Sequence, residues 1–359
     1  MEHFSKSHRF AHFTKSWFGF AFHYSVLKRN LRIIFTLLFL TIGLYSSLPF
    51  RFATIWHRYV PAENIVSDLY IPPYKPINNI NELKFCRIPQ VFSGKKLDEI
   101  DELQLLYNES ISDSSLTYLP GKYNIKHGGE WNPVSCKSLF RIAIIVPYRN
   151  RKHHLNIFLS YIHPFLQKQN IHYRIFIIEQ SSLYKFNRGK ILNIGFAEVN
   201  KKWDYDCFIF HDIDLLPEKL QNLYACSKLP RHASSSVNSL RYNLPYRNMF
   251  GGVTAMRKHH FISANGYSNL YYGWGGEDDE MYERLKNKGF DVVRWDPKVA
   301  RYSMVFHPRS VSLSENRHTL INSYQDRYHS DGLNSLYYNL IKIEERPLYT
   351  WVFVDINNK

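Results

Sequence analysis

The chain has 359 residues, with 46 Lys and Arg against 31 Asp and Glu, and a formal net charge of +15. Hydrophobic residues make up 45% of it and aromatic residues 16%, which is enough for a packed core and excludes a mostly disordered chain. Four cysteines are too few for a disulfide-dense miniprotein or for several zinc sites. The charge by itself also fits a nucleic-acid-binding protein.

An uncharged apolar segment lies near the N-terminus, at residues 33–50, which read IIFTLLFLTIGLYSSLPF. Its length is near the lower limit for a helix that spans a bilayer. Lys28, Arg29 and Arg32 precede it, which predicts a cytoplasmic tail at residues 1–32 and a lumenal remainder. A cleaved signal peptide would have a shorter basic region, and a buried core helix would not be flanked by cation clusters. The sequence therefore favours a transmembrane signal-anchor.

The segment 51–139 is rich in proline and has few periodic runs, which is typical of a stem that leads into a globular domain. It contains a glycosylation sequon at Asn108. All the cysteines follow the apolar segment: Cys86, Cys136, Cys207 and Cys226. In an oxidising lumen they can form two disulfides in any of three pairings, whereas in the cytosol they would stay free thiols.

From residue 140 onward the pattern is that of an α/β domain. Short continuous apolar runs predict buried strands at 141–147, 173–179 and 207–211, and helical spacing predicts a helix at 154–167. This alternation indicates a parallel α/β sheet. In such sheets ligands bind at the carboxyl ends of the strands.

Two carboxylates follow the third predicted strand, at Asp212 and Asp214. Such a pair suits a divalent cation that also contacts phosphate oxygens, although aspartates are common in solvated turns as well.

Aromatic and arginine side chains follow the first predicted strand, in the run Pro147-Tyr-Arg-Asn-Arg151. A ring can stack on a base and guanidiniums can bind phosphate in a bidentate manner, so the run suits a nucleoside diphosphate. A similar group recurs from Phe186 to Lys190. Surface arginines after a strand are also ordinary.

A glycine-rich acidic segment at 272–280 reads YGWGGEDDE. Trp274 between glycines suits a lid or a platform for a sugar. Glu277, Asp278 and Asp279 follow, where a helix is predicted to begin, and the helix dipole would favour the carboxylate form that a general base needs. As an acidic helix start after a turn, the same residues would have no chemical role.

Met304 and His307 place a thioether and an imidazole three residues apart. Imidazole is a frequent ligand of Mn-type ions, whereas thioether is a soft and unusual one. By themselves the two residues fit a core methionine and a hydrogen-bonded histidine better than a metal site.

Taken together, these segments resemble the β1,4-galactosyltransferase family of animal Golgi enzymes. The motifs VPYRNR, FNRGKILNIGF, FHDIDLLPE, MFGGV, GWGGEDDE, Met-x-x-His and SDGLNSL stand in the family's order between residues 140 and 355. The resemblance implies a GT-A-type glycosyltransferase fold, with a Rossmann-like nucleotide-sugar domain at 140–359. It also implies Mn²⁺-dependent, inverting transfer from a UDP-sugar, UDP-Gal or UDP-GalNAc, by a Golgi membrane protein with a lumenal catalytic domain.

The resemblance further implies roles for individual residues. The UDP site would be lined by Pro147, Tyr148, Arg149, Arg151, Phe186, Arg188, Asp212 and Ile213. The Mn²⁺ ligands would be Asp214, Met304 and His307. Trp274 would close over the donor. Asp278 would be the catalytic base, with Glu277 and Asp279 beside it. The implied disulfides are Cys86–Cys136 and Cys207–Cys226.

The acceptor side follows from the same resemblance. Residues 312–321 would lie in a loop that orders on donor binding and completes the acceptor pocket. The positions that match substrate contacts are Met249, Gly251, Gly252, Gly276, Arg317 and Ile321. His318 stands where an apolar aromatic residue is familiar in the family, so the details of the acceptor pocket differ.

Met249 departs from the family pattern, because galactose-specific members usually carry tyrosine there. A tyrosine hydroxyl would crowd the C2 substituent of the donor sugar, whereas a flexible methionine leaves room for an acetamido group. We therefore expect UDP-GalNAc to be used at least as well as UDP-Gal. Neutral packing at Met249 is the alternative.

Two other classes of function fit some of the same residues. A non-catalytic Golgi sugar-binding protein on this fold would not need both the metal and the base candidates. A nucleic-acid-binding or phosphoryl-transfer protein would carry its charge in the globular part. Residues 1–58 hold eight Lys and Arg against one acid, which leaves +8 over the other 301 residues. The charge thus indicates membrane topology and a UDP site. The family resemblance implies a GlcNAc-terminated glycan as the acceptor.

Overall fold

The computed structural model divides the chain into two units, Met1–Ile55 and Trp56–Lys359. It describes residues 28–44, 58–73, 83–88, 111, 113–306 and 313–356. The sequon at Asn108 lies outside the described residues.

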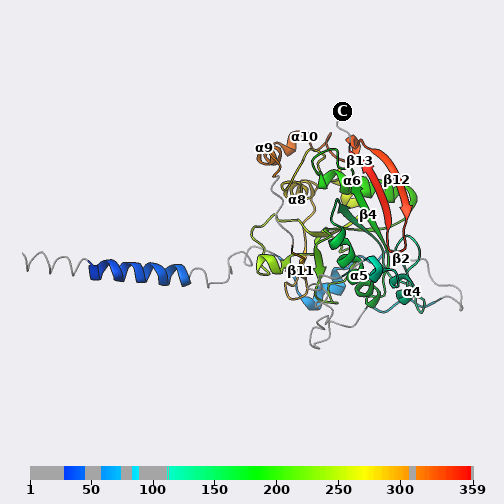
Figure 1. Cartoon of the computed structure of the whole chain (residues 1–359), viewed down its shortest axis with the longest axis horizontal. Coiled ribbons are helices and arrows are strands. Elements are labelled where there is room, and N and C mark those ends of the chain that lie inside the picture. The colour runs from blue at the N-terminus through cyan, green and yellow to red at the C-terminus, as the bar shows by residue number, and fades with distance from the viewer. Residues whose placement is uncertain are drawn as a thin grey trace, which may run out of the picture. The chain divides into compact units, whose positions relative to one another are not determined.

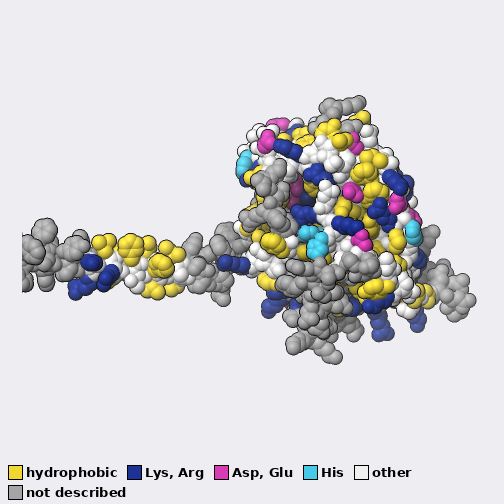
Figure 2. Space-filling view, viewed as in Figure 1, with side chains coloured by type: hydrophobic (Ala, Val, Ile, Leu, Met, Phe, Trp, Pro, Cys, Tyr) yellow, Lys and Arg dark blue, Asp and Glu magenta, His cyan; other side chains and the backbone are white. Residues whose placement is uncertain are grey.

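In the first unit, residues 28–44 form one helix in which every residue is exposed. Apolar side chains cover much of its surface, and basic side chains gather at one end (Figure 2). Among the helices that the structure describes, none is both long and apolar enough to cross a membrane. Residues 45–50 of the predicted anchor, and residues 1–27 of the predicted tail, lie outside the described part of the chain.

A mixed eight-stranded sheet forms the centre of the second unit (Figure 1). Its strands run in the order β12-β13-β4-β3-β5-β9-β7, and β2 pairs with β4 beside this path. The strands β13, β4, β3 and β5 are parallel, and the others are antiparallel to their neighbours. Their bounds are β2 (Glu130–Trp131), β3 (Arg141–Tyr148), β4 (His172–Gln180), β5 (Cys207–His211), β7 (Arg231–His232), β9 (Val253–Arg257), β12 (Asn339–Glu345) and β13 (Thr350–Asp355).

Two hydrophobic cores cover the two faces of this sheet, one packed against α5 (Lys152–Lys168) and one against α6 (Arg188–Lys202). Successive residues of β3 alternate between them: Ile144 belongs to the α5 core and Ile145 to the α6 core, because neighbouring side chains on a strand point to opposite faces. The three predicted strands and the predicted helix at 154–167 are confirmed, each to within two residues.

Shorter elements surround the sheet. In a three-stranded sheet, β11 pairs with β6 and β8, and in a two-stranded sheet β1 pairs with β10. These strands are β1 (Tyr59–Val60), β6 (Leu215–Pro217), β8 (Ser236–Val237), β10 (Arg294–Trp295) and β11 (Arg301–Met304). The remaining helices are α3 (Ile65–Asp68), α4 (Leu119–Tyr123), α7 (Lys258–Ser263), α8 (Glu277–Asn287), α9 (Arg317–Asn322) and α10 (Tyr324–Arg327).

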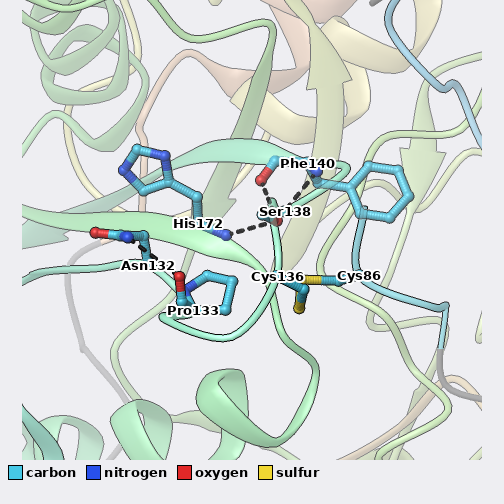
Figure 3. Close-up of a disulfide and its surroundings, with 7 residues drawn as sticks. All are labelled: Cys86, Asn132, Pro133, Cys136, Ser138, Phe140 and His172. Atoms are coloured by element: carbon cyan, nitrogen blue, oxygen red, sulfur yellow. Dashed lines mark hydrogen bonds between the residues drawn. A yellow bond between two sulfur atoms is a disulfide. The ribbon is translucent and has the colours of Figure 1, made fainter. Parts of the chain in front are cut away.

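Two disulfides join Cys86 to Cys136 and Cys207 to Cys226, which confirms the pairing that the family resemblance implied. The first fastens residues 83–88 to the segment before β3 (Figure 3). Two residues beyond Cys136, the Ser138 hydroxyl accepts a hydrogen bond from the backbone N–H of His172 at 2.9 Å. Part of the predicted stem is thus tied to the start of the central strands.

Candidate active site

The arginines that follow β3 lie at the carboxyl end of the sheet. Pro147 and Tyr148 end the strand and are buried. The Arg149 guanidinium donates to the carbonyl of Tyr184 at 2.7 Å and stacks over the Phe186 ring, 5.1 Å from its centre. Burial lowers the pKa of Arg149 from its ordinary value. The segments after β3 and β4 are therefore joined at this edge.

Arg188 is the central cation of the site. Its Nε donates to Asp212 Oδ1 at 2.7 Å, and its Nη1 donates to Asp278 Oδ1 at 2.6 Å and lies 3.5 Å from Glu277 Oε1. The residue is held at the start of α6, where the Asn187 side chain accepts from the backbone N–H of Lys190. One guanidinium thus bridges the loop after β5 and the first turn of α8.

The two predicted aspartates lie between β5 and β6. The backbone N–H of Asp212 donates to the carbonyl of Gly252 at 3.2 Å, Ile213 is buried, and the Asp214 carboxylate lies 3.5 Å from Arg151 Nη1.

Asp214 lies beside Met304, one of its two predicted partners as a metal ligand. In the pairing of β6 with β11, Met304 is opposite Leu215, and the backbone N–H of Val305 donates to the Asp214 carbonyl at 2.7 Å. The third predicted ligand, His307, lies outside the described residues. Within the described part of the chain, no group of three or more His, Cys, Asp and Glu is placed to hold a metal ion.

Three glycines near the acidic turn of α8 are closely confined by neighbouring atoms. Gly276, which precedes the helix, has φ +105°, and a Cβ there would lie 2.5 Å from Cε1 of Tyr271. A Cβ on Gly251 would lie 2.8 Å from Asp278 Oδ2. Gly252 is equally confined, since its Cβ would lie 2.5 Å from the Ser234 hydroxyl. Of these three predicted substrate-contact positions, Gly251 lies directly against the Asp278 carboxylate.

Burial and neighbouring charges raise the pKa values of the acidic residues in the site. Burial raises the pKa of Asp278 well above its ordinary value; Glu277 and Asp212 raise it further, and Arg188 opposes them. Burial likewise raises the pKa of Asp212 and of Glu277. The helix dipole at the start of α8 is expected to favour the carboxylate of Asp278, but burial and the neighbouring acids act in the opposite direction and raise its pKa.

The site also contains more carboxylates than guanidiniums. Its contacts gather the carboxylates Asp212, Asp214, Glu277 and Asp278 around the guanidiniums Arg151 and Arg188. When all are ionised, the group has two surplus negative charges. A divalent cation is one group that neutralises such a surplus of carboxylate charge.

Trp274 lies in a loop that touches two neighbouring segments. Its side chain is 64% exposed, and its carbonyl accepts from the backbone N–H of Ser314 at 3.1 Å. The backbone N–H of Gly273 donates to the carbonyl of Phe186 at 2.8 Å, and Lys185 pairs with Glu315 at 2.5 Å. The loop thus connects the nucleotide side of the site with residues 313–317.

The remaining predicted substrate contacts lie around the acidic turn. Burial raises the pKa of Asp279, and the charge of Arg317, the first residue of α9, partly opposes this rise. Ile321 lies one turn later on α9 and is half-buried. The carbonyl of Met249 accepts from Arg294 Nη2 at 2.9 Å, which fixes its backbone two residues before Gly251.

Sequence reasoning missed Tyr246, whose hydroxyl donates to Asp279 Oδ1 at 2.9 Å. It also missed Arg294 as the support of the Met249 backbone. The available signal was that Tyr246 lies only three residues before Met249, a predicted substrate contact. Among the predicted site residues, Arg188 contacts Asp212, Glu277 and Asp278, and Arg151 contacts Asp214.

Comparisons with known proteins identify the family to which the chain is similar. Residues 102–227 match the family model of the N-terminal region of glycosyl transferase group 7, and residues 231–308 match one described as the N-terminal domain of galactosyltransferase. The chain is 42% identical over 245 residues to β-1,4-galactosyltransferase 4 of Cricetulus griseus, covering 68% of this chain and 71% of that protein. It is 44% identical over 234 residues to β-1,4-galactosyltransferase 1 of Mus musculus, covering 65% of this chain and 59% of that one.

Among solved structures, a mutant of Drosophila β1,4-galactosyltransferase 7 in complex with manganese, UDP-Gal and xylobiose is similar, with a TM-score of 0.53 and 28% identity. The match covers 61% of this chain and 95% of that one. The catalytic domain of the same Drosophila enzyme with xylobiose gives the same TM-score at 29% identity. These likenesses support the predicted GT-A-type α/β fold.

Proposed function

The chain belongs to the β1,4-galactosyltransferase family of UDP-sugar-dependent enzymes, and on that premise we propose that it transfers Gal or GalNAc from a UDP-sugar, in β1,4 linkage and with inversion, to a GlcNAc-terminated glycan on a glycoprotein or glycolipid. The observation that carries the proposal is the contact of one guanidinium, Arg188, with both Asp212 and Asp278. It unites the nucleotide side and the candidate base in a single charged cluster.

On the donor side, the guanidiniums of Arg149, Arg151 and Arg188 bind the diphosphate, and the Phe186 ring, already stacked on Arg149, packs against the nucleotide. Asp214, Met304 and His307 would hold Mn²⁺. A bound Mn²⁺ supplies positive charge that stabilises the leaving UDP. The surplus of acid around Arg188 and the adjacency of Asp214 and Met304 support this assignment.

On the acceptor side, Asp278 is the general base. Its carboxylate takes the proton of the acceptor hydroxyl as that oxygen attacks the anomeric carbon from the face opposite UDP. The new C–O bond forms while the bond to the phosphate oxygen breaks, and its electron pair leaves with UDP. One displacement converts an α-linked donor into a β-glycoside. Burial of Asp278 supports this role, because a raised pKa makes its carboxylate a stronger base.

The cellular setting is part of the proposal. We propose that residues 33–50 anchor the chain in the Golgi membrane, with residues 140–359 in the lumen. Support comes from the exposed, apolar helix at residues 28–44 with basic residues at one end, and from two disulfides, which persist in oxidising compartments.

The test is a matrix of donors and acceptors with the full-length protein in detergent. UDP-Gal and UDP-GalNAc at equal concentration are each offered with GlcNAc, with and without Mn²⁺, and the products are identified by mass spectrometry and linkage analysis. We expect a β1,4-linked disaccharide and an equal amount of UDP, formed only with Mn²⁺. Sugar binding without release of UDP would instead support a non-catalytic sugar-binding protein.

A further inference from the structure

A second cluster of charged side chains surrounds Glu280 of α8, one turn along the helix from Glu277. Glu280 is fully buried, and its carboxylate accepts from the Tyr271 hydroxyl at 2.6 Å and from Arg284 Nε at 2.9 Å. Asp331 lies 3.3 Å from Arg284 Nη2. Arg327 pairs with both Glu280 and Asp331. The cluster thus balances two carboxylates with two guanidiniums.

The two guanidiniums differ in what else they contact. Arg284 is fully buried and donates from Nη1 to the carbonyl of Gly266 at 3.0 Å. Its side-chain partners are thus Gly266, Glu280 and Asp331, none of which lies on α9. Arg327 ends α10 and donates from Nη2 to the carbonyl of Leu320 at 2.8 Å. Leu320 lies on α9, between the predicted acceptor contacts Arg317 and Ile321.

Helix α9 depends on such contacts for its position. It has six residues, none of which is buried, and a helix this short is not stable by itself in water. Its main-chain bonds, Leu320 to Asn316 and Arg317 to Ser314, lie within its own segment. The bond from Arg327 is different because it ties a carbonyl of α9 to the buried acids of α8.

The same cluster also supports the other wall of the site. The Tyr271 ring, whose hydroxyl is bonded to Glu280, is the group that confines Gly276, the residue before Glu277. One carboxylate therefore holds both the turn that presents Asp278 and, through Arg327, the helix that presents Arg317.

We propose that Arg327 is a positioning residue for the acceptor, which fixes α9 against the helix that carries Asp278. This inference rests on the proposed function. The role requires the forked geometry of a guanidinium. Nη1 donates to Ser268 Oγ at 3.0 Å and pairs with Asp331, while Nη2 pairs with Glu280 and donates to the carbonyl of Leu320. A lysine ammonium has three donors at a single point and cannot span these partners.

The experiment compares Arg327→Lys with Arg284→Lys in the full-length protein. Each variant removes one guanidinium from the same cluster and keeps its charge, but only Arg327 contacts α9. For Arg327→Lys we expect the KM for GlcNAc to rise about tenfold, the effect of losing one hydrogen bond from a charged donor, with the KM for the UDP-sugar unchanged. For Arg284→Lys we expect both KM values to stay near those of the unmodified protein, although its melting temperature falls.

Hydrogen exchange, measured without substrates, provides a readout that does not depend on activity. In Arg327→Lys the amides of residues 316–322 should exchange faster while those of β3 keep their protection, and this comparison holds even if Arg284→Lys does not fold. An unchanged KM for GlcNAc, an equal rise in both variants, or faster exchange throughout the domain would each overturn the proposal. If the unmodified chain transfers no sugar, the proposed function fails, and the exchange data alone decide whether Arg327 fixes α9.

Discussion

Replacing Asp278 by asparagine tests the assignment of the base while disturbing little else. Asparagine has the same shape, and its side-chain oxygen can still accept the 2.6 Å hydrogen bond from Arg188. The Cβ-free space at Gly251 remains open as well. The substitution removes only the ability to take a proton. Since general-base catalysis contributes roughly 10²- to 10⁴-fold, we expect kcat to fall by about that factor while the affinity for UDP is kept.

The pH dependence distinguishes a lost base from a damaged site. The base must lose its proton to act, so kcat/KM should rise with pH through an apparent pKa above 3.8, the ordinary value for aspartate, because burial raises the pKa of Asp278. In Asp278→Asn this acid limb should disappear.

Asp279→Asn is the matched control, since Asp279 lies in the same turn but its carboxylate accepts from Tyr246. We expect it to keep the acid limb and to change mainly the KM for the acceptor. Near-normal turnover in Asp278→Asn, or an equal loss of kcat in both variants, would refute the assignment.

Three further predictions concern the donor, a disulfide and acid stability. Met249→Tyr should lower kcat/KM for UDP-GalNAc relative to UDP-Gal in a two-donor competition, and an unchanged ratio would leave Met249 as packing. Replacing Cys86 and Cys136 together by serine should reduce the free energy of unfolding by about 4 kcal/mol in denaturant titrations, because the bridge spans 50 residues; no change would mean that the loop is held by other contacts. His163 is buried and bonded to Tyr173 and Leu348, and burial lowers its pKa from 6.5 to about 4. Its neutral form thus stabilises the fold above pH 6.5, and about 2 kcal/mol should be lost by pH 5. His163→Gln should flatten that slope.

The central strands were predictable because a strand that is buried on both faces has a continuous apolar sequence. Residues 207–211 and 141–147 are short continuous apolar runs, which are typical of strands buried in a parallel sheet. Helices α9 and α10 have no comparable apolar pattern in their sequences. They have no buried residues, and α9 is held by a bond from Arg327 that no local pattern encodes.

Candidate site residues could be proposed from the sequence, but the contacts between them could not. The motif order identified Arg188 and Asp278, yet they are 90 residues apart, and only the folded chain shows that they form one ion pair. The rise in the pKa of Asp278 has the same origin, because it depends on burial and on Asp212, which belongs to a different loop. Tyr246 went unnoticed because its partner, Asp279, is likewise distant in sequence.

Helix α8 carries two charged clusters of opposite character on successive turns. Around Glu280 the acids are matched by guanidiniums within the fold, so this cluster needs no ligand to be neutral. Around Glu277 and Asp278 the acids outnumber the guanidiniums, and Glu277 Oε2 is buried without a hydrogen-bond partner among the described residues. A buried group of this kind costs free energy unless a ligand completes it. The matched cluster stabilises the helix on which the unmatched one lies, so the fold can keep Asp278 poorly neutralised and basic at the place where a cation, UDP and an acceptor hydroxyl are proposed to meet.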